Sequence, residues 1–310
     1  MKLLTSRVAS TDRIVICGKD IRIRGRLIRI AYLDGEKYTF PDDPEAILSQ
    51  LRATAARADI FTFLQCLPET SPKYPYRVEM ENLAVLPVST FEHWWDQQIR
   101  SYPRNRARQA AKRGVVMREV PFGEELIKGI CAVYNETPVR QGKRFPHYGM
   151  TLERARKYAG TFLDRSIYIG AFLGDSMIGF LKLVMNESRT QACLVHILSM
   201  VQHKEKAPTN ALIAEAVRAC AEHDVPFLVY EHFTYGKKVG DSLAHFKEVN
   251  GFKRVDVPRY YVPLTPIGQI ALRLGLHHRF SDVIPEPVAR RLRDLRRSWY
   301  ESRSQTSPEF

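Results

Sequence analysis

The residues best suited to bind a charged substrate gather in the segment 135–149, NETPVRQGKRFPHYG. Pro138, Gly142 and Pro146 in this segment restrict and shape the backbone. Because arginine binds carboxylate or phosphate through paired hydrogen bonds, we predict an anion-binding loop beside an aromatic wall. The alternative is a surface loop with solvated charges. The candidate substrate-binding residues in this segment are Glu136, Arg140, Arg144, His147 and Tyr148.

A second group of titratable side chains, in the segment 230–238 (YEHFTYGKK), follows an apolar run. Acyl transfer to an amine or hydroxyl needs a base, and Glu231 or His232 would supply it, with Tyr235 as a hydrogen-bond donor. The alternative is that one or two of these groups belong to the core and are satisfied by hydrogen bonds. Two strands, ending at 199–200 and at 230–231, would have their carboxyl ends at the site of acyl transfer.

The segment 202–210, QHKEKAPTN, leads into an amphipathic helix predicted over 209–223. Its lysines, together with the free N–H groups of a helix N-terminus, would attract an anion such as a phosphate. The alternative is a solvated loop in which residues 208–210 only cap the helix. The candidate residues for binding the donor are Gln202, Lys204, Lys206, Ala207 and Asn210.

Basic residues dominate the segment 100–118, which has seven of them and no acidic residue. Tyr102 is its one aromatic residue, so phosphate contact is better supported than base stacking, and a solvated helix face is the alternative. The whole chain carries a net charge of +13, and such a field attracts nucleic acid, anionic lipid, nucleotides or phosphorylated substrates alike. Helices predicted between 267 and 303 would pack on the domain or lie on an anionic membrane surface.

Composition sets the class of protein. A chain of 310 residues with 45% hydrophobic and 26% charged residues, and with no apolar run of about 20, is typical of a soluble globular protein. Its length predicts two domains, or one large domain with an appendage. The N-terminus lacks the apolar run of a secretory signal, so we expect a cytoplasmic location. The five cysteines include no Cys-x-x-Cys pair, which argues against a disulfide framework and a thiolate zinc site, and we predict no metal ligand.

The segment 13–113 is predicted to contain both strands and helices. Alternating segments over 13–40, with a turn at Asp34-Gly35, predict an antiparallel meander. A helix is expected over 42–58, because Asp43 can cap it and Pro44 fits its first turn. Strands follow at 60–67 and 77–88. A helix pair, or one interrupted helix, is expected over 90–113, with the break at Pro103.

The order predicted from 115 to 262 is strand, helix, helix, three strands, helix, strand, helix, strand. The clearest pattern is a hairpin of the apolar strands 166–172 and 176–184, joined by Leu173-Gly174-Asp175. The fold class is therefore α/β (α+β), with a mixed sheet flanked by helices on both faces.

Three segments resemble a known family: RNRARQAAKRGVVMRE at 104–119, IGAFLGDSMIGFLKL at 169–183, and Phe246-Lys247 followed by Asn250-Gly251-Phe252. Together they resemble the GNAT acyltransferase superfamily, and in particular its Fem-type branch, which includes the aminoacyltransferases of peptidoglycan assembly. The resemblance implies acyl or aminoacyl transfer, with Phe246 at the substrate and Lys247 stabilising negative charge on the acyl carbonyl. It also implies that residues 12–88 are a shortened first GNAT-like repeat.

Two positions depart from the GNAT enzymes that use acetyl-CoA. Their Gln/Arg-x-x-Gly-x-Gly/Ala loop corresponds to 202–207, where Glu205 takes the first glycine position. Lys247 stands where acetyltransferases commonly have a tyrosine acid, whereas Fem-type members are similar to this chain there. The donor implied is therefore acyl-CoA or aminoacyl-tRNA, acting as a co-substrate without a permanently bound cofactor.

We accordingly predict an acyltransferase that moves an acyl or aminoacyl group to an amine or hydroxyl of an anionic acceptor, such as a cell-envelope or polysaccharide precursor. The alternative is a non-catalytic protein that binds tRNA or another polyanion on a GNAT scaffold. The expected regions are an N-terminal α/β region, basic connecting helices, a GNAT-like domain, basic C-terminal helices and a tail, over 1–88, 89–114, 115–264, 265–303 and 304–310.

Overall fold

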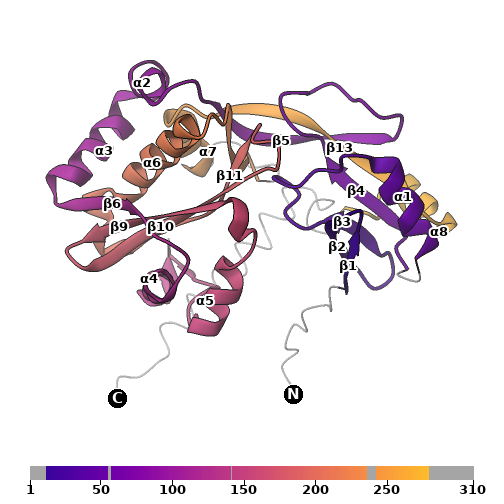
Figure 1. The fold of residues 1–310 in the computed structure, drawn as a ribbon, viewed down its shortest axis with the longest axis horizontal. Helices are drawn as coiled ribbons and strands as arrows, with labels where there is room; N and C mark the ends of the chain where they lie inside the picture. The colour runs from indigo at the N-terminus through magenta and orange to yellow at the C-terminus, as the bar shows by residue number, and fades with distance from the viewer. Residues whose placement is uncertain (1–11, 55–56, 141, 236–241, 279–310) are drawn as a thin grey trace.

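One mixed sheet of eleven strands organises the chain (Figure 1). The computed structural model describes residues 12–54, 57–140, 142–235 and 242–278. The strands of this sheet lie in the order β1-β2-β3-β4-β13-β5-β12-β11-β10-β9-β6, and β7 and β8 form a small separate hairpin. The predicted mixed sheet with flanking helices is confirmed.

The N-terminal half holds an antiparallel meander of β1 (Asp12–Ile16), β2 (Lys19–Arg24) and β3 (Ile30–Leu33), followed by α1 (Pro44–Ala53) and β4 (Ile60–Leu64). β4 lies parallel to β3. Asp43 caps α1 as predicted, because its carboxylate accepts hydrogen bonds from the second and third N–H groups of the helix. The strand predicted at 37–40 is wrong: the N–H groups of Tyr38 and Thr39 both bond to the carbonyl of Gly35, which closes a turn.

Two long strands in the middle of the sheet connect its halves. β5 (Arg77–Pro87) and β13 (Lys253–Pro263) pair antiparallel over nine residues, and β13 also pairs with β4. The last strand of the predicted domain 115–264 therefore lies between two strands of the predicted region 1–88. The sheet is continuous across that boundary.

The helical connection to the second half contains α2 (Phe91–His93), the π-helix η1 (Trp94–Gln98) and α3 (Ser101–Lys112). The expected break at Pro103 is wrong, because the interruption lies at Ile99 and Arg100. Pro103 instead occupies the first turn of α3, where the backbone N–H that proline lacks would have no partner within the helix.

The second half contains the three-stranded antiparallel core of the predicted hairpin region, with helices on either side. Its elements are β6 (Val115–Glu119), α4 (Glu124–Asn135), β7 (Val139–Arg140), β8 (Lys143–Arg144), α5 (Leu152–Ala159), η2 (Leu163–Arg165), β9 (Ser166–Leu173), β10 (Ser176–Met185), β11 (Ala192–Ser199), η3 (Val201–Lys206), α6 (Pro208–Glu222), β12 (Phe227–His232) and α7 (Ser242–Val249).

Alternation along the strands decides which helices cover which face. Leu181 and its same-face neighbours pack against α3 and α6, whereas Phe180 packs against α4 and α5. Figure 1 shows α3 and α6 above these strands and α4 and α5 below them. The second half is therefore a sheet buried between two helical layers.

The chain continues beyond β13 into α8 (Pro266–Arg273), which lies beside β13 at the right end of the view in Figure 1. Most of the basic helices predicted over 267–303, and the tail 304–310, lie outside the described residues. Within the described part of the chain, no helix is long and apolar enough to cross a membrane.

Candidate active site where β11 and β12 diverge

The sheet opens between β11 and β12. These parallel strands pair through Ala192 with Leu228 and Cys193 with Val229, and β12 then shifts its register against β5 between Val229 and His232. Glu231, within that irregularity, has a left-handed backbone with φ +52°. Bulges and strained residues of this kind are common beside active sites. The carboxyl ends of two neighbouring parallel strands therefore separate at the predicted site.

Lys247, on α7, contacts the last residue of β12. Its side chain is completely buried, and its ammonium donates a hydrogen bond to the carbonyl oxygen of His232. The same nitrogen lies 4.8 Å from the ring centre of Tyr230 and 4.9 Å from that of Tyr235. Aromatic faces stabilise a desolvated cation. The neighbouring Phe246 is half-buried and packs against the hydrophobic core cluster that includes residues of α6.

Glu231 is held at the opening by an ion pair with Lys37, which comes from the N-terminal half. Burial raises the pKa of the Tyr158 hydroxyl on α5, and the charge of Glu231 adds to this. The structure therefore brings Lys247, Glu231 and Tyr235, the three predicted catalytic residues, to the end of one strand.

A buried ion network beside Glu231 was missed by sequence reasoning. His232 Nδ1 lies 3.5 Å from Glu81, and Arg259 contacts Glu81 and lies 2.7 Å from Glu36. Burial opposes ionisation of Glu81, but Arg259 outweighs it and lowers the pKa of the carboxyl. Burial, and then Lys37, lower the pKa of His232. No local pattern could reveal this network, because its members come from a turn and three different strands.

His196 on β11 is a second residue that the sequence did not single out. Its ring stacks on Tyr158 with 4.4 Å between ring centres, and Tyr158 lies 6.0 Å from the ring of His147. Burial, helped by Lys182 and His147, lowers the pKa of His196 to about 4. The imidazole is therefore neutral at pH 7 and binds a proton more weakly than an ordinary histidine.

The predicted anion-binding loop is fastened to the end of β11. Arg140 donates a hydrogen bond of 2.9 Å to the carbonyl of Ser199, and Glu136 accepts one of 2.9 Å from the N–H of Gln202. Both side chains are largely buried and so serve to position the loop. Arg144 and Tyr148 are exposed, and Arg144 makes no side-chain hydrogen bond or ion pair with any described residue. His147 is half-buried against Tyr134, Phe145 and Tyr158.

The predicted donor loop forms η3 and the N-terminus of α6. Ala207 has a left-handed backbone, accepts a hydrogen bond from the N–H of Asn210, and gives α6 no side-chain cap. Two arginines of the α3 segment bind the loop from outside, because Arg106 donates to the carbonyl of Lys204 and Arg113 to that of Glu205. The side chain of Lys204 is exposed. The ammonium of Lys206 lies 3.6 Å from the carboxylate of Glu205. The side-chain amide of Gln202 contacts the sulfur of Met200.

The comparisons with solved structures concern the fold. The chain is similar to FemX, with 11% identity over 86% of this chain and 90% of that one and a TM-score of 0.55. It is similar to L-PGS from Bacillus licheniformis, with 11% identity over 87% and 90% and a TM-score of 0.56. A C-terminal domain assigned to a lysylphosphatidylglycerol synthetase of Agrobacterium fabrum matches with 16% identity over 85% and 87%, at a TM-score of 0.54. No protein-family model and no curated protein sequence matches the chain.

The chain has a GNAT-like fold of the Fem type. The resemblance predicted from the segments 104–119, 169–183 and 246–252 is confirmed at the level of the fold.

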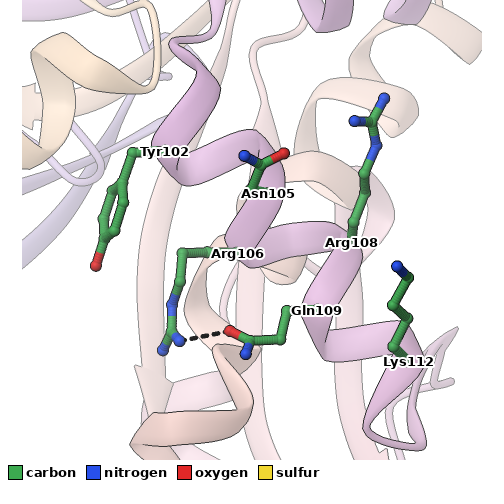
Figure 2. A pocket seen from close by; sticks show the side chains of 6 residues that line it. All are labelled: Tyr102, Asn105, Arg106, Arg108, Gln109 and Lys112. Carbon is green, nitrogen blue, oxygen red and sulfur yellow. Dashed lines mark hydrogen bonds between the residues drawn. The ribbon is translucent and has the colours of Figure 1, made fainter.

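The basic helix α3 contacts η3, in the segment that was predicted to bind the donor. Exposed and half-buried side chains of α3 line an open hollow of about 500 Å³ (Figure 2), in which Arg106 donates a hydrogen bond of 2.6 Å to Gln109. α3 itself contains no acidic residue. The hollow is lined by Tyr102, Asn105, Arg106, Arg108, Gln109 and Lys112.

Proposed function

We propose that this protein is an acyltransferase that moves an acyl or aminoacyl group to an amine or hydroxyl of an anionic acceptor. The observation that carries this proposal is the completely buried ammonium of Lys247 at the end of β12. A lysine loses several kcal/mol of hydration when it is buried, and the carbonyl of His232 and two rings offset part of that cost. A cation fixed in this way is preorganised to stabilise negative charge.

The residues around the opening divide into three roles. Lys247 would stabilise the charge that develops on the acyl carbonyl oxygen, with Tyr235 as a second donor. Glu231 would accept the proton of the acceptor amine or hydroxyl. The exposed Arg144 and Tyr148 would bind the anionic acceptor, while Glu136 and Arg140 position their loop.

The donor side is formed by the start of α6. No side chain caps this helix, and Lys204 and Lys206 add positive charge beside it, which suits the phosphates of acyl-CoA or of aminoacyl-tRNA. The neighbours' names support an aminoacyl donor: lysylphosphatidylglycerol is a lysine joined to an anionic phospholipid. An envelope precursor or lipid headgroup would be an acceptor of that chemical class.

Lys247 and Lys182, both completely buried, provide the test. Lys182 donates to the carbonyl and hydroxyl of Thr161 and to the carbonyl of Ala159, which holds the end of α5. We expect Lys247→Met to lower transfer from acyl-CoA or aminoacyl-tRNA at least about 100-fold. Lys182→Met should lose stability but keep its turnover per folded molecule. Equal turnover in folded Lys247→Met and wild type would contradict the proposed role.

A non-catalytic protein that binds tRNA or another polyanion is the second candidate. The basic hollow on α3 favours it, because the arginines there can contact phosphates. Lys112→Ala should then lower the salt dependence of RNA binding by about one unit of slope, whereas Arg254→Ala, in β13, should not. RNA binding without transfer from any donor would favour this candidate over the enzyme.

A further inference from the structure

Three metal-binding side chains meet at the far end of β5, away from the opening between β11 and β12. Glu79 comes from β5, and His277 and His278 follow α8. One ligand atom from each residue lies within 4.8 Å of the others. His277 Nε2 is 2.8 Å from one carboxylate oxygen of Glu79, and His278 Nε2 is 3.6 Å from the other. These distances would allow one ion to contact all three residues after a small adjustment of the side chains.

The donor set fits a particular class of ion. Two imidazole nitrogens and one carboxylate oxygen bind zinc and neighbouring divalent transition metals, leaving a further position for water. Magnesium and calcium prefer sites made only of oxygen atoms. The set therefore selects a transition metal, with zinc the best match.

Burial gives the site an inner and an outer side. The side chain of His277 is 0% exposed, whereas those of His278 and Glu79 are 37% and 27% exposed. His277 packs 4.7 Å from the ring of Tyr261 and 4.0 Å from that of His278, and its Nδ1 atom has no hydrogen-bond partner among the described residues. Its one polar contact within the described part of the chain is with Glu79. An ion from solvent could reach it past the two exposed ligands.

The charged group that competes for the carboxylate is Arg77. Its guanidinium lies 3.3 Å from the oxygen of Glu79 that His277 contacts, and it donates a hydrogen bond to the carbonyl of Leu272. The second carboxylate oxygen faces His278 and is available to an ion. Arg77 and the ion would therefore share Glu79 from different sides.

We propose that Glu79, His277 and His278 form a binding site for a divalent transition metal, zinc above all, which fastens the segment after α8 to β5. No metal ligand was expected from the sequence, because Glu79 stands about two hundred positions from the two histidines and neither histidine belongs to a zinc-binding spacing. The proposal does not depend on the acyltransferase activity.

The test uses the full-length protein, freed of metal by a chelator and titrated with Co²⁺. We expect one equivalent to bind with the visible absorption of a four-coordinate cobalt site, and Zn²⁺ to displace it. His278→Ala and Glu79→Gln should weaken binding at least about tenfold. His245→Ala, which removes an exposed histidine 3.9 Å from Glu248, is the matched control and should bind as wild type does.

A second measurement does not rely on the spectrum. Zn²⁺ should raise the thermal unfolding temperature of wild type and His245→Ala, and should leave that of His278→Ala unchanged, because a ligand bound to the folded state stabilises it by mass action. Wild-type protein that takes up no stoichiometric Co²⁺ or Zn²⁺, or a His278→Ala variant that binds as tightly as wild type, would overturn the proposal.

Discussion

The units β3–α1–β4 and β11–α6–β12 share one order: a strand, a helix and a second strand parallel to the first. They differ at the carboxyl ends of those strands. In the N-terminal unit, β13 pairs with β4 over five residues, and the rings of Phe61, Phe63 and Tyr260 stack into a closed core. In the second unit the strands diverge, and titratable groups line the gap.

The two helices differ in the same way. Asp43 caps α1 through two backbone N–H groups, whereas α6 begins at a left-handed Ala207 without any side-chain cap. Two N–H groups in the first turn of α1 are therefore already satisfied by Asp43. The first turn of α6 has no side-chain acceptor among the described residues, and for this reason we propose it as the donor side.

Glu231→Gln is the change expected to have the largest effect on the open unit. Loss of the proposed general base should lower turnover by about 10²–10⁴-fold while the protein stays folded. The matched control is Glu187→Gln, which removes another carboxylate paired with a lysine, Lys19, away from the opening. Steady-state transfer assays would check this, and unchanged turnover in Glu231→Gln would remove Glu231 from the mechanism.

Phe63→Ala tests the closed unit. It should lower the free energy of unfolding by about 3–5 kcal/mol, because it leaves a cavity among stacked rings. Turnover per folded molecule should not change, because the ring lies in the scaffold. Urea unfolding measures the first quantity. A loss below about 1 kcal/mol would show that the ring cluster is not the closed core described above.

His196→Gln tests the titratable lining through pH. The pKa of His196 is lowered to about 4 from an ordinary 6.5, so the unfolded chain binds a proton that the folded protein does not between these values. Wild-type stability should therefore fall as the pH drops from about 6.5 to about 4. The variant should lose about 1–2 kcal/mol less over this range, since partial exposure reduces the full effect. Urea unfolding at several pH values would show it, and parallel curves would contradict it.

Substitutions at the starts of α1 and α6 should have the smallest effects on the free energy of unfolding, and the two effects should have opposite signs. Asp43→Ala should lower the free energy of unfolding by about 1 kcal/mol, because two N–H groups lose their acceptor. Ala207→Gly should raise it by about 0.5–1 kcal/mol, because glycine adopts the left-handed backbone without strain. Thermal unfolding of both variants would measure the contrast. Changes of the same sign would contradict it.

Much of the fold could be predicted, because helices and strands leave local patterns. The apolar runs 166–172 and 176–184, joined by Leu173-Gly174-Asp175, predicted β9 and β10, and the cap at Asp43 predicted the start of α1. The wrong strand at 37–40 came from apolar residues whose backbone is instead bonded to Gly35. The wrong break at Pro103 came from treating proline as a helix breaker where it stands in a first turn.

The site could be predicted less well. The resemblance singled out Lys247, but a lone lysine on a short helix carries no sign of burial, and the rings around it come from other segments. His196 was missed because an apolar strand with one histidine is typical of a core. The partners Lys37 and Glu81 belong to the N-terminal half, so no pattern near Glu231 could indicate them.

The sequence alone determined the local elements, the positive charge and the resemblance to the Fem-type GNAT fold, because each depends on residues that are close in the chain. Only the tertiary structure decided that β13 enters the N-terminal half, that Lys247 is buried, and that Glu79 meets His277 and His278. The physical reason is that hydrophobic periodicity specifies which face of an element is buried but not which distant element covers it. Contacts between distant residues come from the packing of the whole sheet, and both proposed sites of this protein depend on such contacts.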